Sequence, residues 1–234
     1  KIKDNNKYKI EDIFNESKEF DIVLFQENWI YQDLIRKIMN EKKIIISEKT
    51  KFIIKDNSKR SSGLNLAFNS SFNIEYYEES LFSDCNGYLF DYNDCLASKG
   101  FVYSLVSSSD YKINIYVTHL DAGSSKNDML VRSIQLKEIS NHIQNIDNDY
   151  PVILTGDFNI DYYKDVHIID EFINENNFTN LRWDNLIETE SMIDYVFYRN
   201  GKNNLISVID FGINIALINK SDHLPIEFTI VLEK

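Results

Sequence analysis

Six polar side chains lie at the ends of four strand-like runs, and their types are those that bind divalent metals, hold phosphate or move protons. They are Glu27, His119, Asp157, Asn159, Asp222 and His223. The whole chain has only four histidines, so two of them belong to this set. Strand ends and the loops beyond them are where a rigid scaffold usually presents catalytic groups. The set therefore raises the question of whether these residues form one site.

Taken singly, each signal has an ordinary structural interpretation. A carboxylate such as Glu27 after a buried run is most often a solvated strand end. His119 shares a strand face with apolar residues and alone fits a histidine at the edge of a core. The "GDFN" segment with Asp157 and Asn159 is also a common turn, and Asp222 with His223 fits a capping pair. Only their combination favours chemistry.

In combination, the six residues suit hydrolysis of a phosphate ester. Mg²⁺ prefers carboxylate oxygens and keeps several waters, and Glu27 supplies such a ligand. Asn159 and His119 offer donors for phosphate oxygens. A nucleophilic water needs a nearby base, and either Asp157 or His223 fits that role.

The elements that must position these residues are predicted from apolar periodicity. An unbroken apolar run at residues 20–27 indicates a strand covered on both faces. Two strand-like runs flank a polar spacer at 107–110, which indicates a hairpin. The strongest helix pattern lies at 124–146, with Asp128 as its N-terminal cap. Further helices are predicted at 7–17, 30–38 and 166–173, and further strands at 42–47, 51–55, 63–69, 150–157, 191–199 and 224–233.

Length and composition fit one folded domain that covers residues 1–234. The chain has 234 residues, of which 43% are hydrophobic and 13% aromatic, as in globular proteins. Strands and helices mix throughout, and no repeat or linker interrupts them. This predicts a single α+β domain with a sheet-rich core.

Charge and cysteine content bear on partners and compartment. A net charge of −12 weighs against a polyanion such as DNA as substrate. No apolar run reaches the roughly 20 residues that span a bilayer. Cys85 and Cys95 are close in sequence and are expected to be close in space. They form a disulfide in a secreted protein or remain free thiols in a cytosolic one.

Five segments resemble, in this order, the motif series of the endonuclease/exonuclease/phosphatase superfamily. They are "LFQENW", "YVTHLDA", "VILTGDFNID", "MIDYVFY" and "SDHLPI". The resemblance implies a DNase I-like fold, a four-layer sandwich in which two packed, mostly antiparallel sheets are flanked by helices. It extends from about residue 20 to the C-terminus.

A narrower match is similar to the neutral sphingomyelinase branch. That branch typically carries Lys-Gly before the strand that pairs with its Thr-His-Leu strand, followed by an Arg-x-x-Gln-Leu helix. Here these are Lys99-Gly100, Thr118-His119-Leu120, and Arg132 with Gln135-Leu136. The resemblance implies a phospholipid substrate at a membrane surface, a peripheral or secreted location, with a cytoplasmic one also possible, and a monomer that takes no nucleic acid.

The resemblance also implies residue roles. Glu27 binds Mg²⁺, or another divalent cation such as Mn²⁺ or Ca²⁺, and Asp222 supports the metal side. His119 and Asn159 hold the phosphate, and Asp157 orients or helps deprotonate the water. His223 is the general base, and Asp194 in "MIDYVF" holds it in place. These seven residues form the predicted site.

Two features depart from the family pattern. The family's first strand carries a metal-binding asparagine some tens of residues before the position of Glu27. Asn5 and Asn6 are only 22 and 21 positions before it, within a helix-like segment. A further N-terminal strand, or a partner strand, is therefore expected beside residues 20–27, because a buried strand must satisfy its backbone groups on both sides. In addition, the region between residues 199 and 220 has Phe211 as its sole aromatic, whereas bacterial sphingomyelinases dock on membranes with exposed aromatics there.

Three functions remain in competition at this point. The first is a metal-dependent phosphodiesterase that cleaves sphingomyelin to ceramide and phosphocholine. The second is a DNase I-like nuclease, which the negative charge and Lys99-Gly100 oppose. The third is a catalytically silent binding protein on the same fold, which the retained His119, Asp157 and His223 oppose.

Overall fold

The computed structural model describes residues 4–29, 31–40, 42–46, 62–87, 94–146, 149–181 and 192–234. The predicted strand at 51–55 lies outside these residues. The N-terminal part contains helix α1 (Asp4–Glu16), a short 3-10 helix (Ser17–Glu19), β1 (Ile22–Phe25), α2 (Gln32–Ile38), β2 (Lys43–Ile46), β3 (Asn65–Phe68) and β4 (Asn73–Leu81). The middle part contains β5 (Gly100–Ser108), β6 (Tyr111–His119), α3 (Lys126–Asn145), β7 (Val152–Asp157) and α4 (Tyr162–Asn176). The C-terminal part contains β8 (Thr179–Asn180), β9 (Asp194–Arg199), β10 (Leu205–Ile213), η3 (Ile215–Leu217) and β11 (Ile226–Glu233).

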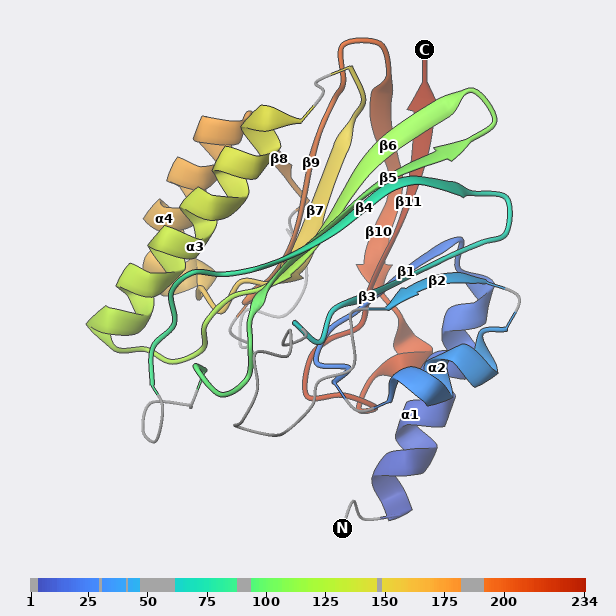
Figure 1. Cartoon of the computed structure of the whole chain (residues 1–234), viewed down its shortest axis with the longest axis horizontal. Coiled ribbons are helices and arrows are strands. Elements are labelled where there is room, and N and C mark those ends of the chain that lie inside the picture. The colour runs from blue at the N-terminus through green and yellow to red at the C-terminus, as the bar shows by residue number, and fades with distance from the viewer. Residues whose placement is uncertain are drawn as a thin grey trace.

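The strands form a six-stranded sheet in the order β4-β5-β6-β7-β9-β8, opposite a second layer made of two parts. One part is the three-stranded sheet β1-β3-β2, and the other is the β10-β11 hairpin. All pairs are antiparallel except β6 with β7. Figure 1 shows α3 and α4 on the outside of the large sheet and α1 and α2 beside the three-stranded sheet.

Three hydrophobic clusters separate the four layers. The first joins α3 and α4 to the large sheet and includes Ile139 and Phe172 of the helices with Tyr116 and Phe197 of the strands. The second lies between the sheets and contains Leu66 of β3, Val117 of β6 and Ile153 of β7. The third joins α1 and α2 to the small sheet. Because strand side chains alternate between faces, β5 contributes to both the first and the second cluster. The predicted α+β four-layer sandwich is confirmed.

Most predicted elements are found where periodicity placed them, and one cap differs. Helix α3 is capped by Ser125, whose hydroxyl accepts from the backbone N–H of Asp128 while the Asp128 carboxylate accepts from the N–H of Ser125. Asp128 is therefore the third helical residue of a capping box and not the cap itself. Its prediction as the cap was wrong, because a Ser three residues upstream satisfies the free N–H groups first.

The expected additional strand beside residues 20–27 remains a prediction. Among the described residues, β1 pairs with β3 alone. Residues 4–16 form a helix, as their spacing predicted. Strand β1 and the C-terminal hairpin both pack on the cluster between the sheets.

Cys85 and Cys95 form a disulfide, so their predicted proximity is confirmed. The bond closes a loop with a sequence separation of 10 residues. Inside this loop, the backbone N–H of Asn86 donates to Asp121, and the carboxylate of Asp94 accepts from the N–H of Ala122. The loop is thus fastened to the chain segment that follows His119.

Replacing both cysteines with serine is expected to lower the free energy of unfolding. A closed loop of this size contributes roughly 3 kcal/mol or less in the chain-entropy model. Urea unfolding of Cys85→Ser/Cys95→Ser beside the oxidised parent measures the loss. The reduced parent should unfold at the same urea concentration as the double variant. Equal stability of oxidised parent and double variant would contradict the expectation.

Candidate active site

Strand register brings three of the predicted residues together. His119 ends β6 and is the register partner of Asp157, which ends β7. Asp157 in turn is the partner of Asp194, which begins β9. Three neighbouring strands therefore present these side chains at one end of the large sheet. A Cβ at Gly156 would lie 2.0 Å from the carbonyl oxygen of Thr118, so the glycine allows β7 to approach β6 here.

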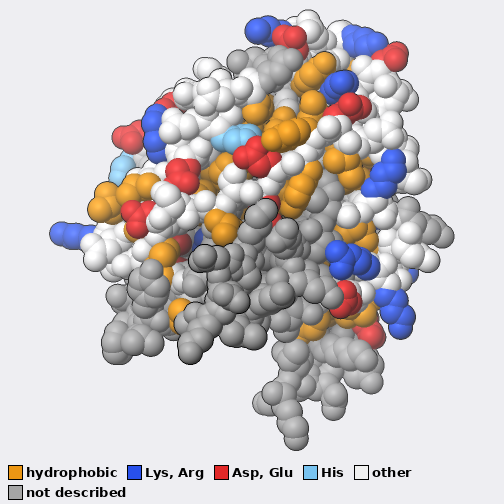
Figure 2. All heavy atoms as spheres, viewed as in Figure 1, with side chains coloured by type: hydrophobic (Ala, Val, Ile, Leu, Met, Phe, Trp, Pro, Cys, Tyr) orange, Lys and Arg blue, Asp and Glu red, His pale blue; other side chains and the backbone are white. Residues whose placement is uncertain are grey.

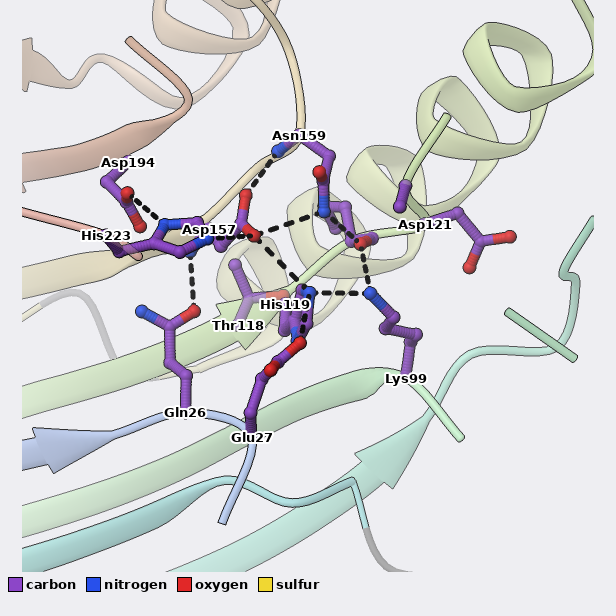
Figure 3. Close-up of polar contacts among 12 residues, drawn as sticks. Gln26, Glu27, Lys99, Thr118, His119, Asp121, Asp157, Asn159, Asp194 and His223 are labelled. Carbon is purple, nitrogen blue, oxygen red and sulfur yellow. Dashed lines mark hydrogen bonds and ion pairs between the residues drawn. The ribbon is translucent and has the colours of Figure 1, made fainter. Parts of the chain in front are cut away.

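Glu27 and His223 reach this end of the large sheet from the opposite layer. Glu27 follows β1, and its Oε1 lies 3.9 Å from Nε2 of His119. His223 lies between β10 and β11, with Nδ1 2.6 Å from Oδ2 of Asp194 and Nε2 3.8 Å from Oδ2 of Asp157. The site is therefore built where the two layers meet, and Figure 3 shows these side chains pointing toward one another.

Asn159 is held in a turn two residues beyond the end of β7. Its φ of 51° lies in the left-handed region, which asparagine tolerates better than most residues. Its backbone N–H donates to Oδ1 of Asp157, and its side-chain amide donates to the carbonyl of Leu120 at 2.9 Å. The amide is therefore directed at the gap between the ends of β6 and β7.

Asp222 is the residue before His223, and it makes no described hydrogen bond to the other predicted site residues. The described contact of its carboxylate is a hydrogen bond from the hydroxyl of Ser221. The residue is exposed, and its charge helps to raise the pKa of His223. A role for Asp222 at the metal remains a prediction.

Two further residues belong to the site by their contacts. The ammonium of Lys99 lies 2.5 Å from Nε2 of His119 and 3.3 Å from the carboxylate of Asp94, and it donates to the carbonyl of Leu120. Gly100 is the register partner of His119, so the hairpin turn alone could have placed Lys99 there. The other residue is Gln26, whose side chain accepts from the backbone N–H of Asp157. Sequence pattern gave no signal for that contact.

Burial and charge set the protonation of the site. Burial and the nearby Lys99 ammonium hold the pKa of His119 well below its usual range, so its ring is neutral. Since lysine has only donors, Nε2 of His119 accepts from Lys99. Burial, and then the charge of Asp194, raise the pKa of Asp157 to about 7. The hydrogen bond with Asp194 raises the pKa of His223 to about 9.

Asp194→Asn is expected to lower the pKa of His223 from about 9 toward the ordinary value of about 6.5. NMR titration of the imidazole C–H signals in metal-free protein measures this shift, and the exposed His167 on α4 serves as an internal reference. A pKa that stays near 9 would show that Asp194 does not hold the ring.

The sign of the accompanying stability change follows from the raised pKa. A group that binds its proton more tightly when folded stabilises the fold fully below its unfolded pKa. That contribution is lost as the pH rises through the folded pKa. The Asp194→Asn protein should therefore be least stable relative to the parent near pH 6. The difference should shrink as the pH rises through about 9.

The donor set fits a cation that keeps most of its waters. Among the described residues, no three His, Cys, Asp or Glu side chains form a closed metal cage. The Glu27 side chain is 61% exposed, and the carboxyl groups of Asp157 and Asp194 lie at the same end of the large sheet. Mg²⁺ is commonly bound through one or two carboxylates, waters and substrate phosphate. Glu27 is thus suited to hold such an ion.

Comparison with known proteins agrees with this architecture. Residues 10–192 match the family model described as Endonuclease/Exonuclease/phosphatase family 2. The chain belongs to the endonuclease/exonuclease/phosphatase superfamily, and its resemblance to the sphingomyelinase branch is confirmed.

A sphingomyelinase of Mycobacterium tuberculosis is 24% identical over 171 residues, which cover 65% of this chain and 32% of that protein. The chain thus spans about a third of the length of this curated relative.

Solved structures share the fold at low identity. Beta toxin from Staphylococcus aureus superposes with a TM-score of 0.70 at 17% identity, covering 96% of this chain and 92% of the toxin. A variant of that toxin, solved with bound magnesium ions, gives 0.64 at 17% identity over 98% and 89% of the two chains. A Bacteroides thetaiotaomicron mannosyl-6-phosphatase gives 0.69 at 16% identity over 97% and 91%. These likenesses establish the fold and leave the substrate open.

Proposed function

We propose that the protein is a Mg²⁺-dependent phosphodiesterase of the neutral sphingomyelinase type. It hydrolyses sphingomyelin to ceramide and phosphocholine as a single domain of residues 1–234. The observation that carries the proposal is the His223–Asp194 pair facing Asp157, opposite Glu27 and beside the neutral His119. Sphingomyelinases among the relatives support the lipid as substrate.

The proposed mechanism uses these side chains in an order that the geometry suggests. Glu27 would hold the divalent cation, which when bound neutralises charge on the phosphate. Asn159 and Lys99 would donate to phosphate oxygens, and His119 would help to hold the phosphate by accepting from Lys99 and so fixing its ammonium in place. A water placed between Asp157 and His223 would attack phosphorus, and His223 would take its proton. The bond from phosphorus to the ceramide oxygen would then break, that oxygen would take a proton from solvent, and His223 would return its own proton to solvent.

Charge distribution favours a lipid over a nucleic acid as the substrate. The net charge is −12. Figure 2 shows Lys and Arg side chains dispersed over the described part of the face in view, without a continuous basic patch. A polyanion gains most of its binding free energy from such patches. Zwitterionic sphingomyelin does not require one.

The proposed setting is a membrane surface outside a reducing compartment. In this proposal the protein binds that surface peripherally and as a monomer. None of the described helices is long and apolar enough to cross a bilayer. The Cys85–Cys95 disulfide supports an oxidising environment, and thus a secreted protein rather than a cytoplasmic one.

The test is release of phosphocholine from sphingomyelin vesicles, with Mg²⁺ or with EDTA, beside nicking of supercoiled plasmid under the same conditions. The proposal expects Mg²⁺-dependent phosphocholine release and intact plasmid. Plasmid nicking without phosphocholine release would instead identify a nuclease. Inactivity on both substrates would favour a silent binding protein.

A further inference from the structure

The side chain of Gln26 connects the two layers that supply the site. Its Oε1 accepts a hydrogen bond of 2.7 Å from the backbone N–H of Asp157, a residue 131 positions away in sequence. Gln26 follows β1 of the small sheet, and Asp157 ends β7 of the large sheet. Figure 3 shows the Gln26 side chain extending from the β1 end toward Asp157, with Glu27 as the next residue.

Glu27 depends on its backbone for its place in the site. Its side chain is 61% exposed, so packing does little to fix it. Its φ of 56° is in the left-handed region, which a residue with a Cβ adopts only when its surroundings hold it there. The residues on either side of Glu27 are both fixed by hydrogen bonds. Gln26 accepts from the backbone N–H of Asp157, and the backbone N–H of Asn28 donates to the carbonyl of Gly63 at 2.8 Å.

We infer that Gln26 is a positioning residue for cation binding. By fastening the end of β1 to the end of β7, its side-chain oxygen sets the spacing between the Glu27 carboxylate and the groups of the large sheet that would hold phosphate and water, His119 and Asp157. A cation held by Glu27 can then meet a phosphate held on the large sheet. The inference rests on the proposed function for the identity of that phosphate, but the cation site itself is defined without it.

The test separates positioning from simple stabilisation by using two variants of matched size. Gln26→Met keeps the length of the side chain and removes the acceptor, whereas Gln26→Glu restores an acceptor oxygen at the same place. Gln144→Met, on an exposed position of α3, is the control. Titration calorimetry with Mg²⁺ and Mn²⁺, in the absence of any substrate, measures cation binding, and circular dichroism checks the fold.

Gln26→Met is expected to weaken cation binding by about 10–100-fold, the usual effect of losing a partner that orients a metal ligand. In turnover assays the cation concentration for half-maximal rate should rise by the same factor, while the KM for lipid at saturating cation stays near the parental value. Gln26→Glu should recover most of the loss in both measurements.

Three results would overturn the inference: parental cation affinity in Gln26→Met, failure of Gln26→Glu to restore it, or absence of cation binding by the parent. A failed sphingomyelin assay is a different outcome. If the parent binds the cation and Gln26→Met binds it more weakly, Gln26 positions Glu27 whatever the substrate is.

Discussion

His223→Ala is expected to lower the rate of phosphocholine release by about 10²–10⁴-fold, the usual cost of losing a general base. The ring of His223 is fixed by Asp194 at 2.6 Å, and its free nitrogen faces Asp157 at 3.8 Å. A water between these groups would lose its proton acceptor in the variant. His223 lies in the loop between β10 and β11 and belongs to none of the three hydrophobic clusters, so the fold should survive.

The pH dependence of turnover by the parent tests the assignment of His223 as the base independently. A general base acts in its unprotonated form, and the pKa of His223 is raised to about 9 in the metal-free protein. Turnover by the parent should therefore rise from pH 6 toward pH 9, whereas the small residual rate of His223→Ala should lose that rise. Measuring kcat across this range in both proteins checks the assignment.

Two variants make the result interpretable. In the parent, Oδ1 of Asp157 accepts from the backbone N–H of Asn159 at 2.8 Å. Asp157→Asn keeps an oxygen for this bond but removes the negative charge. It should also remove most activity. His167→Ala, on the exposed face of α4, should retain the parental rate. A parental rate in His223→Ala would exclude His223 as the base.

The fold was predictable from sequence where periodicity is strong. Residues 22–25 and 152–157 read as buried strands because both of their faces are covered, and the structure covers both. The helix at 126–145 repeats Leu136, Ile139 and Ile143 on one face, and that face packs on the large sheet. Division of the second layer into two hydrogen-bonded parts was not predictable, because pairing between distant strands leaves no local pattern.

The site residues were likewise predictable where the signal is local in sequence, and not where the contact joins distant segments. His119 and Asp157 were recognisable because each ends a strand-like run. The contact of Lys99 with His119 follows from hairpin register, which a turn at residues 109–110 fixes. The bond between Gln26 and Asp157 spans 131 positions, so nothing near either residue announces it. The roles of all seven predicted residues remain hypotheses, and the variants of Glu27, Asp157, Asp194 and His223 test four of them.

Removing divalent cations is expected to abolish phosphocholine release. The substrate phosphate is negative, and the site presents the Glu27 carboxylate together with Asp157, Asp194 and Asp222. Lys99 is the described cation closest to His119, and it already pairs with Asp94 at 3.3 Å. Without a metal the phosphate would meet mostly like charge. Since a bound metal is worth several kcal/mol of transition-state stabilisation, its loss should reduce the rate by at least about 100-fold.

Glu27→Ala distinguishes a cation bound at this site from one that acts on the vesicles. If Glu27 is the protein ligand, the variant should need far more Mg²⁺ for half-maximal rate and should bind Mg²⁺ weakly in calorimetry without lipid. Glu16→Ala, at the exposed end of α1, should match the parent in both measurements. Undiminished turnover after exhaustive dialysis against EDTA would exclude the metal-dependent mechanism. If turnover still needs the cation but Glu27→Ala binds Mg²⁺ as tightly as the parent, the metal is held by other ligands. Loss of a true carboxylate ligand would have weakened Mg²⁺ binding.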